Sequence, residues 1–227
     1  MSIAENLSRI RRRVAAAAER VGRDGSEIVL MGVSKRQPDD RLREAYDSGL
    51  RDFGENTVQE LNRKAALFAA EGRTPRWHFI GHLQRNKINK LLEYPVHRIH
   101  SVDSSKLANA LDKRAPAGGL DVLIEVNVGE EEQKGGVRPS ELSALLAGFA
   151  DYGNLRLRGL MSIPPVVDNP RRYFESLRDL RLQHVENPAM TQATELSMGM
   201  SGDFEEAIEC GSTIVRVGTA LFGARPS

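Results

Sequence analysis

The sequence is short of cysteine and of long apolar runs, and each shortage excludes a class of protein. Cys210 is the single cysteine, which excludes an internal disulfide and a zinc site made of clustered cysteines. No apolar stretch reaches the roughly 18 residues of a membrane-spanning helix, and the N-terminus lacks the basic-then-apolar order of a signal peptide. We therefore expect a protein of the cytoplasm, where thiols stay reduced.

The sequence also lacks an excess of charge of one sign. It has 32 Lys and Arg residues against 31 Asp and Glu residues, which gives a formal net charge of +1. A protein that binds the nucleic-acid backbone usually carries a large basic excess, so we expect no nucleic-acid partner. No Pro-, Ser- or Gly-rich linker divides the 227 residues. We therefore predict a single domain over 1–227, a length that buries a sizeable core.

Short apolar runs alternate with helix-like stretches along the chain, after an amphipathic helix predicted at 3–21. The predicted strands are 27–33, 51–54, 76–80, 97–101, 121–127, 155–161, 194–198 and 213–217. The predicted helices between and after them are 39–48, 56–70, 84–93, 104–114, 139–150, 169–184, 203–210 and a short segment at 219–223. So many βα units predict an α/β protein with a closed (β/α)8 TIM barrel and an additional N-terminal helix. An open doubly wound sheet is the alternative, although it normally has fewer strands.

Lys35 is a candidate functional residue because it ends the first apolar run. Chemistry in such barrels lies at the C-terminal ends of the strands, so the stem of this lysine is expected to begin inside the barrel. Shielding from water lowers the pKa of a lysine and provides the neutral amine that a Schiff base requires. The competing interpretation is a solvated lysine at the start of the loop before Pro38.

The loops after the last two predicted strands suit a phosphate group. Residues 197–203 read Ser-Met-Gly-Met-Ser-Gly-Asp, with Ser201 as a helix N-cap, and 217–220 read Val-Gly-Thr-Ala before a short helix. Loops after strands seven and eight, followed by a short extra helix, form the recurrent phosphate site of this fold. Ordinary turn formation by glycine and serine is the alternative interpretation.

Arg216 interrupts the apolar run 213–217. An arginine buried in a strand needs a partner. It faces either a ring nitrogen or carboxylate of a ligand, or it forms an inter-strand ion pair with Glu125 or Glu195.

Signals for other chemistries are missing from the sequence. His78, His82 and His100 end predicted strands, but no H-x-H or H-E-x-x-H spacing occurs. We interpret them as core or hydrogen-bonding residues and predict no metal site. The chain also lacks a G-x-S-x-G elbow and a P-loop, so neither a serine hydrolase nor a P-loop enzyme is indicated.

Several strings of residues together resemble the YggS/PROSC family of pyridoxal phosphate homeostasis proteins. The strings are Val33-Ser34-Lys35, Phe53-Gly54-Glu55-Asn56, Trp77-His78-Phe79-Ile80-Gly81-His82-Leu83-Gln84-Arg85-Asn86-Lys87, Gly159-Leu160-Met161, Leu196-Ser197-Met198-Gly199-Met200-Ser201 with Asp203, and Gly211-Ser212-Thr213 through Arg216-Val217-Gly218-Thr219 to Phe222-Gly223. They occur in order from about residue 5 to residue 225, so the resemblance covers nearly the whole chain.

The resemblance implies a monomeric barrel like the N-terminal domain of alanine racemase, which holds pyridoxal 5′-phosphate (PLP). It implies a role for each matching residue. Lys35 would form the Schiff base (internal aldimine), Arg216 would face the pyridine nitrogen, Ser201, Gly218 and Thr219 would hold the phosphate, and Asn56 and Met198 would line the ring.

The same resemblance leads us to expect a PLP carrier or buffer without robust catalysis, with apo-forms of PLP-dependent enzymes as recipients. An arginine does not protonate the pyridine nitrogen, which weakens the electron sink of the cofactor. Racemases of this type add a second domain and a partner subunit, for which we expect no room after the last segment. Two alternatives stay open. One is a PLP-dependent racemase or lyase completed by oligomerisation, and the other is a sugar-phosphate barrel with Lys35 as an aldolase-type base.

Overall fold

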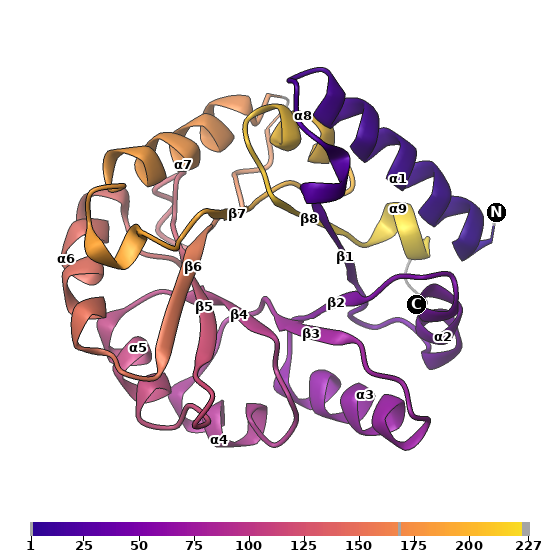
Figure 1. Cartoon of the computed structure of the whole chain (residues 1–227), viewed down its shortest axis with the longest axis horizontal. Coiled ribbons are helices and arrows are strands. Elements are labelled where there is room, and N and C mark those ends of the chain that lie inside the picture. Colours follow the sequence, from indigo (N-terminus) through magenta and orange to yellow (C-terminus); the bar gives the residue numbers. More distant parts are fainter. Residues whose placement is uncertain (1, 168, 224–227) are drawn as a thin grey trace.

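The computed structural model describes residues 2–167 and 169–223 and contains a closed ring of eight parallel strands (Figure 1). Each strand pairs with the next one along the chain, and β8 pairs with β1 to close the ring. The strands are β1 (Val29–Val33), β2 (Asp52–Glu55), β3 (Arg76–Phe79), β4 (Arg98–Val102), β5 (Leu120–Glu125), β6 (Leu155–Met161), β7 (Glu195–Ser197) and β8 (Ile214–Val217). The predicted (β/α)8 TIM barrel is therefore confirmed, and the open sheet is excluded.

The helices surround this ring (Figure 1). The α-helices are α1 (Ile3–Glu19), α2 (Asp39–Asp47), α3 (Val58–Ala70), α4 (Ile88–Leu91), α5 (Ser105–Asp112), α6 (Leu142–Ala147), α7 (Arg171–Gln183), α8 (Phe204–Glu209) and α9 (Thr219–Phe222). Short 3-10 turns are η1 (Gly25–Glu27), η2 (Arg85–Lys87), η3 (Pro139–Glu141), η4 (Gly148–Asp151) and η5 (Pro188–Met190). The helices predicted at 84–93 and 139–150 are thus divided into shorter pieces. Across residues 2–167 and 169–223, none of the helices is both long and apolar enough to cross a bilayer.

The additional N-terminal helix, α1, begins at a capping box. The hydroxyl of Ser2 accepts a hydrogen bond from the Glu5 N–H at 3.2 Å, and the Glu5 carboxylate accepts one from the Ser2 N–H at 2.8 Å. Such reciprocal bonds satisfy donors that the first turn of a helix leaves free. The buried stripe of Ile3, Leu7 and Ile10 faces the protein, and α1 packs beside α8 and α9 (Figure 1). The predicted helix therefore covers the last βα units of the barrel.

The barrel interior combines apolar and charged side chains, whereas branched apolar residues usually fill it. Met31, Ile80 and Ile214 form an apolar cluster there. Met31 pairs with Asp52 on β2 and with Arg216 on β8. Because paired residues of parallel strands project to the same side, these two charged side chains also point inward. Polar side chains therefore run through the interior between the C-terminal and the N-terminal ends of the strands.

Candidate functional site

A cavity of about 250 Å³ lies at the C-terminal ends of the strands, and we call it the C-terminal cavity. Apolar side chains of Val33, Ile80, Ile163 and Met200 form part of its wall. The rest of the lining contains the predicted site residues Lys35, Asn56, Ser201, Arg216, Gly218 and Thr219, together with Gly202. Residues distant in sequence therefore meet here as the barrel prediction requires, with Met198 as the exception.

Met198 lies outside the C-terminal cavity, so the structure gives no support to its predicted position beside a ring. The preceding residue, Ser197, points into the barrel, where its hydroxyl accepts a hydrogen bond from Arg216 at 2.9 Å. Side chains alternate along a strand, so Met198 projects outward and is fully buried in the layer between barrel and helices. Met200, two residues later, lines the cavity in its place.

A buried ionic cluster supports the segment that carries Lys35. The Ser34 hydroxyl donates to Glu55 Oε1 at 2.6 Å. Lys64 Nζ donates to the Ser34 carbonyl oxygen and to Glu55 Oε1, both at 2.7 Å. The side chains of Lys64 and Glu55 are fully buried. The cluster therefore fixes the backbone at the end of β1, and Lys35, itself half-buried, lies at the cavity.

The chain turns sharply just after Lys35. The Gln37 N–H donates to the Ser34 carbonyl at 3.0 Å, and Arg36 has a φ of 57°, in the left-handed region that few non-glycine residues adopt. The Arg36 N–H donates to Glu60 Oε1 at 2.7 Å, which holds the turn against α3. Both sides of Lys35 are thus anchored by hydrogen bonds to neighbouring elements.

Arg216 is 4 % exposed and lies in the barrel interior at the cavity. Its Nη1 donates to the Ser197 carbonyl at 2.6 Å and to Ser197 Oγ at 2.9 Å, and its Nη2 donates to the Ser162 carbonyl at 2.9 Å. Burial lowers the pKa of Arg216 to about 10. The guanidinium is therefore still protonated at neutral pH and fixed mainly by backbone oxygens.

Among the described residues, Arg216 forms no ion pair with Glu125 or Glu195, which was the alternative prediction. The Glu195 carboxylate instead accepts a hydrogen bond from Arg98. Glu125 ends β5, and its charge favours the protonated Arg216 without an ion pair between them. Burial, reinforced by the charge of Asp103, raises the pKa of Glu125 to about 7.

The loops after β7 and β8 are tied together at the cavity by Ser201. Its hydroxyl accepts hydrogen bonds from the N–H groups of Gly218 and Ala220, each at 3.2 Å. Gly199 lets the loop after β7 pack closely on α8, since its φ is 92° and a Cβ there would lie 2.5 Å from the Ala207 side chain. The arrangement fixes the Ser201 hydroxyl at the start of α9 and beside the cavity.

Asn56 lines the C-terminal cavity directly after β2. Gly81 makes room for it, because a Cβ on Gly81 would lie 1.9 Å from the Asn56 carbonyl oxygen. The side-chain oxygen of Asn56 is buried and has no hydrogen-bond partner in the described part of the chain. A buried acceptor of this kind indicates a partner supplied by a ligand or by water.

Sequence reasoning missed the ionic cluster of Lys64 and Glu55. A signal was present, because Lys64 lies on the buried stripe of α3 with Leu61, Ala65 and Phe68. A lysine on the apolar side of a helix needs a buried partner, although the sequence does not show which one.

The predicted histidines take two different positions. His78 and His100 are buried and hydrogen-bonded to each other, whereas the side chain of His82 is 70 % exposed and lies 3.6 Å from Asp103. Residues 2–167 and 169–223 contain no group of three or more His, Cys, Asp or Glu side chains that could hold a metal ion.

Comparisons with known proteins agree on one family. The family model described as the alanine racemase N-terminal domain matches residues 4–226. The pyridoxal phosphate homeostasis protein of Aquifex aeolicus is 48 % identical, with 99 % of each chain covered. The protein of that name from Escherichia coli is 42 % identical over 98 % of this chain and 97 % of its own. The structure of PipY from Synechococcus elongatus with PLP bound is 34 % identical, with a TM-score of 0.85 over 98 % of this chain and 100 % of PipY.

Proposed function

The chain belongs to the family of pyridoxal phosphate homeostasis proteins, and on that premise we propose that it binds PLP at the C-terminal cavity and takes part in PLP homeostasis as a carrier or buffer. The observation that carries the proposal is the convergence of Lys35, Arg216 and the Ser201 loop on one cavity. This set offers an amine, a cation and a hydroxyl to a molecule that has an aldehyde, a ring nitrogen and a phosphate.

The donors and acceptors of the cavity fit that molecule. The bonds to Ser197 and Ser162 engage three of the five N–H donors of Arg216 in the described structure. The two others remain for an acceptor such as a ring nitrogen. The Gly218 and Ala220 N–H groups hold Ser201 Oγ at the cavity, and the hydroxyls of Ser201 and Thr219 suit a phosphate as hydrogen-bond donors. The buried Asn56 side-chain oxygen, which has no hydrogen-bond partner among the described residues, can accept from a ligand donor.

PLP supplies an aldehyde, and we propose that the amine of Lys35 condenses with it. A C=N bond forms between Lys35 Nζ and the aldehyde carbon, and the aldehyde oxygen leaves as water. Hydrolysis reverses the same step and releases the cofactor. The anchored turn and the ionic cluster of Lys64 and Glu55 keep Lys35 at the cavity, so binding needs little rearrangement.

We further propose that this site has no robust catalytic activity. Catalysis with PLP needs protein acids and bases close to the reacting atoms. Among the described residues, the lining of the C-terminal cavity includes no His, Tyr, Cys, Asp or Glu side chain. The protonated Arg216 donates a hydrogen bond and keeps its proton, which leaves the ring nitrogen neutral. Cytoplasmic location, a monomeric state and transfer to apo-enzymes stay predictions.

An absorbance titration with PLP tests this function. Wild-type protein should develop the visible band of a lysine-bound PLP, and Lys35→Ala should abolish it. Lys106, exposed on α5, provides the matched control, and Lys106→Ala should behave as wild type. An α-proton exchange assay with D- and L-alanine should give no turnover above background. A robust exchange rate of the purified protein would instead establish a racemase or lyase, and an absent band would overturn the Schiff base at Lys35.

A further inference from the structure

A hydrogen-bonded column of buried polar side chains runs through the barrel from the C-terminal cavity. Arg216 Nη1 lies 2.9 Å from Ser197 Oγ, and Ser197 Oγ lies 3.0 Å from His100 Nδ1. His100 Nε2 lies 2.9 Å from His78 Nδ1, and His78 Nε2 lies 3.0 Å from Asp52 Oδ1. All these side chains are buried. The column therefore links one end of the barrel to the other without a break.

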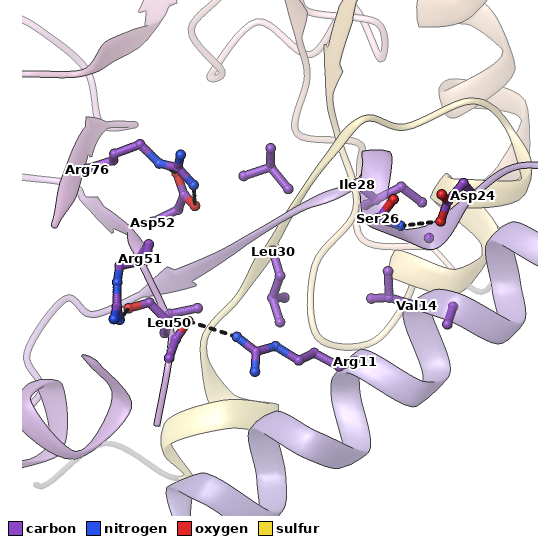
Figure 2. Close-up of a pocket in the computed structure, with 14 residues that line it drawn as sticks. Arg11, Val14, Asp24, Ser26, Ile28, Leu30, Leu50, Arg51, Asp52 and Arg76 are labelled. Carbon is purple, nitrogen blue, oxygen red and sulfur yellow. Dashed lines mark hydrogen bonds and ion pairs between the residues drawn. The ribbon is translucent and has the colours of Figure 1, made fainter. Parts of the chain in front are cut away.

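The far end of the column reaches a second cavity, the N-terminal cavity, of about 440 Å³ at the other end of the barrel (Figure 2). Asp52 and Arg76 both line it, and Figure 2 shows their side chains against each other. Arg76 Nε donates to Asp52 Oδ1 at 2.8 Å, and Arg76 Nη2 donates to Oδ2 at 2.6 Å. Asp52 is thus fixed between this guanidinium and His78.

The charges at the two ends determine the direction of every hydrogen bond in the column. Burial favours the neutral carboxyl of Asp52, but the hydrogen bonds from His78 and Arg76 outweigh it and lower its pKa, so the carboxylate only accepts. Arg216 only donates. Burial lowers the pKa of both His78 and His100, so each neutral imidazole donates from one nitrogen and accepts at the other.

One assignment of hydrogens satisfies these conditions. His78 Nε2–H donates to Asp52, and His78 Nδ1 accepts from His100 Nε2–H. His100 Nδ1 accepts from the Ser197 hydroxyl, and Ser197 Oγ accepts from Arg216. With the opposite tautomers, His100 would donate to Ser197 Oγ, and the serine hydrogen would have to leave the column.

We propose that Asp52 is a positioning residue for Arg216, acting through His78, His100 and Ser197. Its carboxylate fixes both imidazole tautomers and the direction of the Ser197 hydroxyl, and these fix how the guanidinium faces the ligand. The inference rests on the proposed function, because the purpose of this orientation is the hydrogen bond from Arg216 to the PLP ring nitrogen. It assigns a role in cofactor binding to a carboxylate at the opposite end of the barrel.

Nitrogen NMR of the imidazoles tests the column in the protein without PLP. In wild type at neutral pH, His78 and His100 should both show a protonated Nε2 and an unprotonated Nδ1. Asp52→Asn should reverse or mix the tautomer of His78, because an amide offers a donor as well as an acceptor. Asp121→Asn is the matched control, since Asp121 is a buried carboxylate bonded to Arg156 and Arg158. It should leave both tautomers unchanged.

PLP binding tests the consequence for the site. Asp52→Asn should raise the Kd for PLP about tenfold, the lower end of the loss seen at metal sites when the partner behind a ligating side chain is removed. It should also shift the visible band of bound PLP and its pH profile, while borohydride still attaches PLP to Lys35. Ser197→Ala, which keeps the backbone carbonyl that binds Arg216, should give the same shift even if Asp52→Asn does not fold.

Two results would overturn the inference. One is an unchanged pair of tautomers in folded Asp52→Asn, and the other is an unchanged PLP band in Ser197→Ala. Wild-type protein that binds no PLP but keeps the expected tautomers would refute the proposed function and leave the column intact, so the two failures are distinguishable.

Discussion

The two ends of the barrel use charged residues in different ways. At the N-terminal end, cations face anions: Asp121 accepts from Arg156 at 2.5 Å and from Arg158 at 2.9 Å, and Arg76 binds Asp52 through two nitrogens. At the C-terminal end, Arg216 binds mainly backbone oxygens and lies with Lys35 at a cavity that no described carboxylate lines. A cavity lined by a cation and by no carboxylate suits an anionic ligand, whereas the ion pairs at the other end neutralise each other.

The two cavities differ in the same way, and the larger cavity is not the one proposed to bind the cofactor. The N-terminal cavity is the larger, at about 440 Å³ against about 250 Å³. Its arginines are engaged by the protein, as Figure 2 shows for Arg11, which donates to the Gly49 carbonyl at 2.8 Å. Arg51 likewise donates to the Leu50 carbonyl at 2.9 Å. The N-terminal cavity is therefore the poorer binding site despite its larger volume, because the protein already engages the hydrogen-bond donors of its arginines.

The largest expected effect comes from breaking the ionic cluster below the C-terminal cavity. Lys64→Met should lower the free energy of unfolding by about 3–5 kcal/mol, because it leaves the buried Glu55 charge without its cation. The double variant Lys64→Met with Glu55→Gln should recover most of that loss. Urea unfolding measures both. A double variant as unstable as the single one would contradict the charge-based explanation.

Removing a buried charge at the N-terminal end of the barrel, at Asp121, should affect stability alone. Asp121→Asn should lower the free energy of unfolding by about 2–3 kcal/mol, because a buried carboxylate that receives charged hydrogen bonds is removed. The PLP affinity should stay as in wild type. A loss of PLP affinity equal to that in Asp52→Asn would show that the ion pairs of Asp121 also support the cofactor site, which would contradict the difference between the two ends.

A change of pH should act through Glu125 at the C-terminal end. Burial raises its pKa from 4.5 to about 7, so between these values the native protein keeps a proton that the unfolded chain has released. The free energy of unfolding therefore falls as pH rises through this range and is level above it. Relative to wild type, the free energy of unfolding of Glu125→Gln should rise by about 3 kcal/mol between pH ~4 and pH ~8. Urea unfolding at both pH values checks this, and a constant difference would refute it.

The smallest effect is expected at the N-terminal cavity itself. Arg11 is exposed and bonds only a backbone carbonyl among the contacts described. Arg11→Ala should change the free energy of unfolding by less than about 0.5 kcal/mol and leave the PLP titration unchanged. Weaker PLP binding in this variant would show that the N-terminal cavity takes part in function.

The barrel could be predicted because its signal is local and repeated. Most strands are short, largely buried segments, and the helices between them carry their own caps, such as Thr57 before α3 and Ser104 before α5. The position of Lys35 and Arg216 at strand ends follows from the same pattern. Together with the resemblance, this pattern predicted the candidate residues that line one cavity, with Met198 as the exception.

The contacts of those residues could not be predicted, because they depend on packing between distant elements. Lys64 meets Glu55 only once α3 lies on β2. Arg216 bonds the carbonyls of Ser197 and Ser162, and a sequence does not show which backbone oxygens face inward. Met198 points outward because side chains alternate between the two faces of β7 and the residue that follows it. A strand of three residues is too short for this alternation to be recognised in the sequence.

Mapping the attachment point of the cofactor tests the central claim most directly. The wild-type protein is mixed with one equivalent of PLP, reduced with borohydride and digested, and the modified peptides are identified by mass spectrometry. The account predicts label at Lys35 alone, and the same single position in Lys106→Ala. Label spread over several lysines, or concentrated at a lysine away from the C-terminal cavity, would contradict it.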